Sequence, residues 1–174
     1  LNNKEVDVIW SGLSILPERE KQMIFSQPYL ESRQVIVVKK GSVITRKKDL
    51  KGKSVGFQRG SSSEKWISSD PGTINDLKNL AGYKNNVLAL KDLESGAIDA
   101  VVMDETIARY NNTRKPDTYN VLADELGKEY YGVGFRKTDT GLRDAINKAL
   151  DEMKQDGTMD HIINKWLGSA VLVK

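Results

Sequence analysis

A strand, a turn of small residues and a helix follow one another in the first half of the chain. Ser54–Gln58 has the composition of a strand, and Gly60–Ser63 contains one glycine and three serines. A helix around Lys65–Ile67 follows. This order is typical of α/β folds, in which each helix packs on the sheet that its strand enters. Ser62 or Ser63 is then either the helix N-cap residue or, with the free N–H groups there, part of an anion site.

The rest of the chain continues this pattern of short apolar strands and amphipathic helices. Apolar runs predict buried strands at Val6–Trp10, Gln34–Val38 and Ile98–Asp104, and shorter ones at Val87–Leu90, Tyr119–Leu122 and Tyr131–Phe135. Helical patterns are found at Glu18–Ile24, at Ile74, Leu77 and Leu80, at Thr106–Tyr110, over residues 140–156 and from Thr158 onward. The sequence therefore predicts an α/β fold.

Composition excludes several classes of function. The chain of 174 residues has 39% hydrophobic residues, 29% charged residues and a net charge of +3, which is too mild to indicate nucleic-acid binding. It has no cysteine, so thiol catalysis and zinc-thiolate sites are excluded. His161 is the single histidine and falls on the polar side of the last predicted helix, so neither a Ser-His-Asp triad nor a histidine-rich metal site can be built. We expect no catalytic residues, metal or cofactor.

Two isolated positions have the chemistry of a ligand site. Arg19 lies just after the turn at Ser11–Gly12 and before Tyr29, where exposed backbone N–H groups and a guanidinium suit a carboxylate or phosphate. Asp104 ends a predicted buried strand, and ligands bind at the carboxyl ends of strands in open α/β sheets. The alternatives are a surface arginine and a helix N-cap aspartate.

Four groups of segments resemble one known family, in its order and spacing. They are VDVIWSGLSILPEREKQMIFSQPY, DLKGKSVGFQRGSSSE, LESGAIDAVVMDE, and YYGVGFRK followed by LRDAINKALDEMKQDGTMDHIINKWLG. They resemble the polar amino-acid substrate-binding proteins of ABC importers, which have the type II periplasmic-binding-protein fold. The resemblance implies two α/β lobes that close on a ligand, joined by strands crossing near Glu31–Gln34 and Glu129–Gly132. Lobe 1 would comprise residues 1–33 and 127–174, and lobe 2 residues 34–126.

The resemblance also implies roles for individual residues. Arg19 matches the arginine that pairs with the ligand carboxylate, and Asp104 matches the acid that receives its α-ammonium group. The remaining matches are a turn that contacts the ligand, a helix start whose N–H groups reach the carboxylate, and a position that faces the ligand side chain. Gly12 and Ser14 match the turn, and Ser61 and Ser62 match the helix start. Gln58 matches the position that faces the ligand side chain. Arg59 departs from the family, because a small residue is commoner at its position.

The function implied is the capture of a polar L-amino acid outside the cytoplasm and its delivery to an ABC importer permease. The protein would be periplasmic or a cell-surface lipoprotein, with no nucleic-acid partner. It would associate with the membrane only through a permease or a lipid anchor. The alternatives are an enzyme on the same fold, resembling cyclohexadienyl dehydratase, and a sensory ligand-binding module. The chain starts without methionine and without the early strands of lobe 1. We therefore expect a longer natural protein, or a partner chain, to cover the gap.

Overall fold

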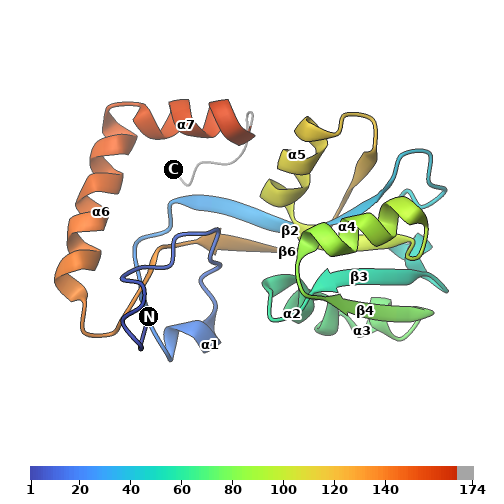
Figure 1. Cartoon of the computed structure of the whole chain (residues 1–174), viewed down its shortest axis with the longest axis horizontal. Helices are drawn as coiled ribbons and strands as arrows, with labels where there is room; N and C mark the ends of the chain where they lie inside the picture. The colour runs from blue at the N-terminus through green and yellow to red at the C-terminus, as the bar shows by residue number, and fades with distance from the viewer. Residues whose placement is uncertain (168–174) are drawn as a thin grey trace. The chain divides into compact units, whose positions relative to one another are not determined.

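The computed structural model describes residues 1–167, so that residues 168–174 of the predicted lobe 1 lie outside the described part. The chain divides into two compact units (Figure 1). The central unit comprises residues 33–128, and the terminal unit comprises residues 1–32 and 129–174.

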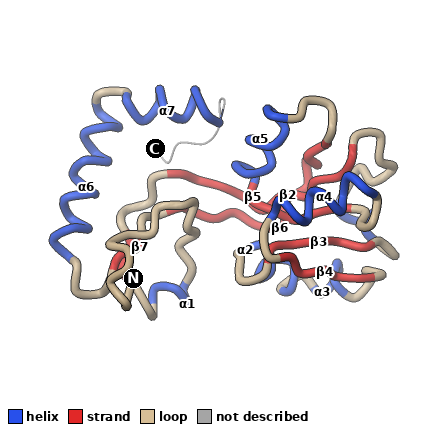
Figure 2. The backbone as a smooth tube through the Cα atoms, viewed as in Figure 1, coloured by secondary structure: helices blue, strands red, loops and turns tan. Residues whose placement is uncertain are grey.

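The central unit is built on a five-stranded mixed sheet, drawn in red in Figure 2. Across the sheet the strands are β4 (Asn79–Tyr83), β3 (Ser54–Gln58), β5 (Ala100–Asp104), β2 (Leu30–Lys39) and β6 (Tyr119–Tyr131). β3 runs parallel to β4 and to β5, whereas β2 runs antiparallel to β5. The carboxyl ends of β3 and β5 therefore lie at the same edge of the sheet.

Helices cover both faces of this sheet, which explains why its inner strands are apolar without interruption. On one face, α4 (Asn86–Ser95) and α5 (Glu105–Arg114) pack over Val35 and Val37. On the other face, α2 (Ser62–Ser68) and the 3-10 helix η1 (Lys47–Leu50) pack over Ile36 and Val38. The strands predicted around residues 34–38, 54–58 and 98–104 are confirmed as β2, β3 and β5.

The strand predicted at Val87–Leu90 is wrong, because these residues belong to α4. The side chain of Asn85 accepts a hydrogen bond from the N–H of Leu88 at 3.0 Å and so caps the start of this helix. Gly96 ends it in the left-handed conformation, with φ of 81°. A short apolar run does not distinguish a buried strand from a buried helix, and here the flanking residues decide.

The helix predicted through Ile74, Leu77 and Leu80 is also wrong. The helix α3 (Pro71–Ile74) is a single turn, capped by the Asp70 side chain, which accepts from the N–H of Thr73 at 3.2 Å. Leu80 lies in β4 and pairs with β3, because the open edge of β3 offers hydrogen bonds that a second helical turn would forgo.

Within residues 1–167, the terminal unit has a two-stranded antiparallel sheet and three helices. The elements are α1 (Pro17–Glu20), β1 (Ile24–Phe25), β7 (Gly134–Phe135), α6 (Thr140–Gln155) and α7 (Thr158–Leu167). Its core joins residues from the first and last parts of the chain, namely Leu30, Tyr131, Leu150, Met159 and Ile163. The two C-terminal helices were predicted from their apolar periodicity and are confirmed, and His161 is exposed as expected.

Two predictions in the terminal unit are wrong. Val6–Trp10 is not a buried strand: Ile9 alone forms a bridge, to Gly134, and the side chain of Trp10 is half exposed. A strand needs a neighbour along its length, and Gly134 is the one partner among the described residues. The helix expected at Glu18–Ile24 ends at Glu20 instead, because Ile24 pairs with Phe135 in β1. Within residues 1–167, no helix has the length and apolar character needed to cross a membrane.

Candidate functional site

Asp104 ends β5 and stands at the N-cap position of α5, but its side chain makes no capping hydrogen bond. The residue is 7% exposed. Its Oδ1 accepts a hydrogen bond from Nε2 of Gln34 at 3.0 Å. The simpler interpretation, an aspartate used to cap a helix, therefore does not describe this carboxylate.

Gln34, the partner of Asp104, was not predicted from the sequence. It is fully buried in β2, directly opposite Asp104 in the antiparallel pairing. Its Nε2 also donates to Oγ of Ser62 at 3.2 Å, and its Oε1 accepts from Oγ of Ser63 at 2.6 Å. The signal in the sequence was an amide at the start of a β-branched run, where burial requires hydrogen-bond partners.

The start of α2 lies beside this amide. The N-cap position belongs to Ser61 and not to Ser62 or Ser63, which corrects the sequence prediction. Oγ of Ser61 donates to the carbonyl oxygen of Gln58 at 2.6 Å and so closes the turn after β3, while Ser62 and Ser63 are buried in the first turn of the helix. Gln58 is half-buried at the end of β3. Because β3 and β5 are parallel, Gln58 and Asp104 lie at the same edge of the sheet.

Arg59, the departure from the family, is exposed and lies over β4. A Cβ atom added to Gly82 would lie 2.7 Å from Nε of Arg59, so the glycine is what lets the arginine side chain cross this strand. Gly82 in β4 therefore leaves room for the side chain of Arg59 in the turn after β3.

Glu105 follows Asp104 but has different partners. Its carboxylate receives Nε and Nη2 of Arg33 at 2.8 and 3.0 Å, and Nη2 of Arg109 at 2.8 Å. Burial raises the pKa of the Glu105 carboxyl, but the hydrogen bonds from these two arginines outweigh burial and lower the pKa overall. Arg33 also pairs with Glu125 at 3.2 Å, which ties β2 to β6. This cluster is structural.

The other three predicted residues belong to the terminal unit. Nη1 of Arg19 donates to the carbonyl oxygen of Ser14 at 3.0 Å, and the guanidinium makes no ion pair with any residue that the structure describes. Ser14 is buried and pairs with Tyr131. Gly12 is exposed with φ of 66°, and a Cβ atom there would lie 3.3 Å from the Tyr131 ring. The turn before Arg19 thus needs glycine.

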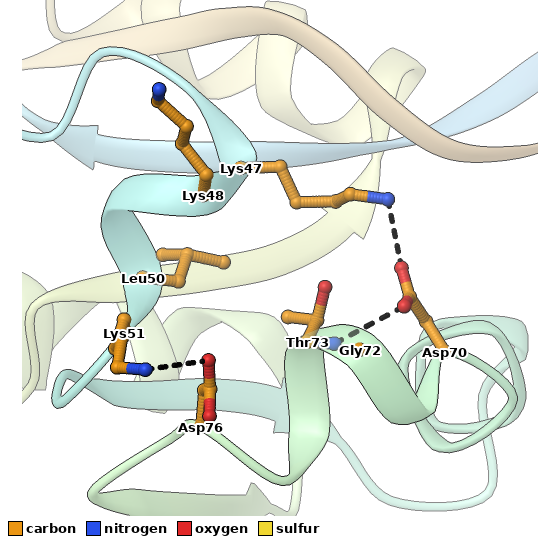
Figure 3. Close-up of a pocket in the computed structure, with 8 residues that line it drawn as sticks. All are labelled: Lys47, Lys48, Leu50, Lys51, Asp70, Gly72, Thr73 and Asp76. Carbon is orange, nitrogen blue, oxygen red and sulfur yellow. Dashed lines mark hydrogen bonds and ion pairs between the residues drawn. The ribbon is translucent and has the colours of Figure 1, made fainter.

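Two hollows are distinct from these residues. A cavity of about 290 Å³ in the central unit lies between η1 and α3 (Figure 3). Its charged residues pair with one another, Lys47 with Asp70 at 2.8 Å and Lys51 with Asp76 at 3.3 Å, while Lys48 points away from both aspartates. These pairs hold two short helices together and leave no free carboxylate for an ammonium group.

The second hollow is an apolar groove of about 210 Å³ in the terminal unit. It is lined by Trp10, Tyr29, Leu30, Leu150, Met153, Met159, Ile162, Ile163 and Trp166. The rings of Trp10 and Tyr29 meet edge to face, with centroids 6.1 Å apart. None of the described residues that line the groove is charged, so this lining does not suit the charged ends of an amino acid. Among the described residues, no group of three His, Cys, Asp or Glu side chains is arranged to hold a metal ion.

Comparison with known proteins decides the family. The model of the bacterial extracellular solute-binding proteins, family 3, matches residues 1–169. The chain belongs to this family. A probable histidine-binding protein of Neisseria gonorrhoeae is 36% identical over 170 residues, and the L-cystine-binding protein TcyJ of Escherichia coli K12 is 34% identical over 173 residues.

The family 3 fold is also found in the solved structures. A substrate-binding protein of an ABC uptake transporter from Streptococcus pneumoniae, crystallised with bound histidine, matches with a TM-score of 0.92 and 36% identity. The match covers all of this chain and 73% of that one. The chain spans 62% and 64% of the lengths of the Neisseria and Escherichia relatives, while 95% and 98% of it align with them. The predicted α/β periplasmic-binding-protein fold is confirmed.

Proposed function

We propose that the protein binds a polar L-amino acid and delivers it to an ABC importer. The support from the comparisons is that family 3 relatives are named for histidine and L-cystine binding and that a solved relative holds histidine. The support from the site is chemical, because an amino acid has an anionic and a cationic end and the chain offers a group for each. The observation that carries the proposal is the buried Asp104 carboxylate, which ends a strand without capping its helix.

The α-carboxylate of the ligand is assigned to residues of both units, and the α-ammonium group to the central unit alone. In the terminal unit, Arg19 pairs with the α-carboxylate, and Gly12 and Ser14 contribute contacts from the turn before it. In the central unit, Asp104 receives the α-ammonium group, Ser61 and Ser62 contribute N–H groups for the carboxylate, and Gln58 meets the side chain. A ligand that contacts both units favours the conformations in which both units reach it. This preference is the basis of a hinge motion that closes the units on the ligand.

We infer that the protein acts by binding alone and works outside the cytoplasm. Its family consists of extracellular solute-binding proteins, and the relatives named above are binding proteins and not enzymes. The finer assignments are part of the same proposal: the ABC permease is the partner, and the location is the periplasm or, for a lipid-anchored form, the cell surface.

A screen of the full-length gene product tests this proposal. The melting temperature is measured with each of the common L-amino acids and with L-cystine, and each hit is followed by calorimetry. A ligand present at about a hundred times its Kd stabilises the protein by about 2.7 kcal/mol, which such a screen detects easily. We expect one or a few polar L-amino acids to bind. A protein that binds none of them would contradict the proposal.

A further inference from the structure

Gln34 is a polar residue that continues into an apolar run on one face of β2, after the small polar residue Ser32. It shares that face of β2 with Ile36 and Val38, which pack in the core beneath α2. Gln34 and Ile36 are both fully buried. An amide in such a place destabilises the fold unless its hydrogen bonds are made, and an apolar side chain would serve packing equally well. The amide therefore needs an explanation beyond the stability of the core.

The contacts of the amide fix its orientation. The hydroxyl of Ser63 donates to Oε1, so that Nε2 is turned toward Oγ of Ser62 and Oδ1 of Asp104. The opposite orientation would place the amide oxygen against a carboxylate oxygen, two acceptors in contact. The bond to Asp104 runs between residues that are directly opposite in adjacent strands, where side chains on one face interact most closely.

We propose that Gln34 is a positioning residue for the ligand's ammonium group. It holds the Asp104 carboxylate in one rotamer and joins it to the first turn of α2. A neutral amide does this without neutralising the carboxylate, in contrast to the arginines that hold Glu105. The inference rests on the proposed function, in which Asp104 receives the ammonium group, and it adds a residue that acts through Asp104 without touching the ligand.

The direct test compares two ligands that differ by the amino group. The probes are the L-amino acid that gives the largest thermal shift and the carboxylic acid that lacks its α-amino group; for L-histidine, the second is imidazolepropionic acid. With Gln34→Leu, we expect the Kd of the amino acid to rise roughly ten- to a hundredfold, because the carboxylate is no longer held in place. The Kd of the des-amino acid should change less than about twofold.

Two variants separate positioning from general damage. Ile36→Val shortens a side chain on the same face of the same strand, so it should lower the melting temperature without changing the ratio of the two Kd values. Ser63→Ala removes the bond that orients the amide and keeps Gln34 itself, so it should change the ratio in the same direction as Gln34→Leu but by less. An equal rise in both Kd values with Gln34→Leu would overturn the inference.

A ligand-free experiment keeps the inference distinct from the proposed function. The denaturation midpoints of Gln34→Leu, Asp104→Ala and the double variant form a double-mutant cycle. We expect the effects to be non-additive, because each single substitution breaks the same hydrogen bond. Additive effects would overturn the inference even if the protein binds amino acids. A wild-type protein that binds no amino acid would overturn the proposed function and, with it, the role assigned to Gln34.

Discussion

Arg33 and Glu105 form a two-point ion pair, with Nε on one carboxylate oxygen at 2.8 Å and Nη2 on the other at 3.0 Å. Asp104 precedes Glu105 in the chain, and its carboxylate accepts from the amide of Gln34. Two adjacent acids thus have partners of different charge. The first belongs to the proposed ligand site, whereas the second stabilises the central unit, and substitutions should distinguish these two roles.

Glu105→Gln should lower the free energy of unfolding without a selective effect on ligands. We expect a loss of about 2 kcal/mol at neutral pH, the usual value of hydrogen bonds to a charged group. The Arg33 side chain is 33% exposed, so water solvates it once its partner is lost, and the loss stays below that of a fully buried pair. Urea denaturation measures it. The matched control is Glu125→Gln, which removes a more exposed pair and should cost less than about 1 kcal/mol.

The same variant should also change the pH dependence of stability. The pKa of Glu105 is lowered in the folded state, so its contribution is present above the unfolded pKa of about 4.3 and is lost as the pH falls through the lower folded value. Wild-type stability should therefore fall on acidification more steeply than that of Glu105→Gln. Parallel curves for the two proteins would show that the carboxylate is not held by these arginines.

Asn85→Ala should destabilise the central unit by about 1 kcal/mol, because it removes the side chain that caps α4. Thermal or urea unfolding measures the change. Asn75→Ala, at an exposed position that is not an N-cap, is the control and should change stability by less than about 0.5 kcal/mol. If both variants were equally stable, Asn85 would not be what fixes the start of the helix.

The long periodic segments of the fold were predictable from sequence, whereas several of the short ones were not. β2 is a continuous β-branched run, and α6 repeats apolar residues over several turns, so both were recognised. α4 and β4 were not, because Val87–Leu90 and Leu80 have too few neighbours of defined period to separate helix from strand. The capping side chain of Asn85 decides the structure of α4, and the adjacent strand β3 decides that of β4.

The charged residues of the candidate site stay a prediction from the sequence, and the residue that supports Asp104 was not predicted. Arg19 and Asp104 are recognisable by their chemistry and by their places after a turn and a strand. Gln34 was not recognised, because its role depends on the register that places it opposite Asp104. Strand register is a tertiary property that one strand's sequence does not contain. The ion pair of Arg33 and Glu105 was missed for the same reason.

Arg19→Ala should nearly abolish amino-acid binding. Loss of one partner from a desolvated ion pair costs on the order of 3–5 kcal/mol, which is a rise in Kd of roughly a hundredfold to a few thousandfold. Calorimetry with the best ligand of the screen measures it. Lys21→Ala, two residues further on and exposed, is the control for the loss of one positive charge and should leave the Kd nearly unchanged. Unchanged affinity in Arg19→Ala would refute the role of Arg19.

The most direct test of the account is the ligand preference of Asp104→Asn. Calorimetry on the full-length protein compares an L-amino acid with the carboxylic acid that lacks its α-amino group, in the wild type and in this variant. If Asp104 receives the ammonium group, the variant loses affinity for the amino acid by at least about a hundredfold, and affinity for the des-amino acid hardly changes. If both ligands lose affinity equally, Asp104 has a structural role alone, and the proposed site is wrong.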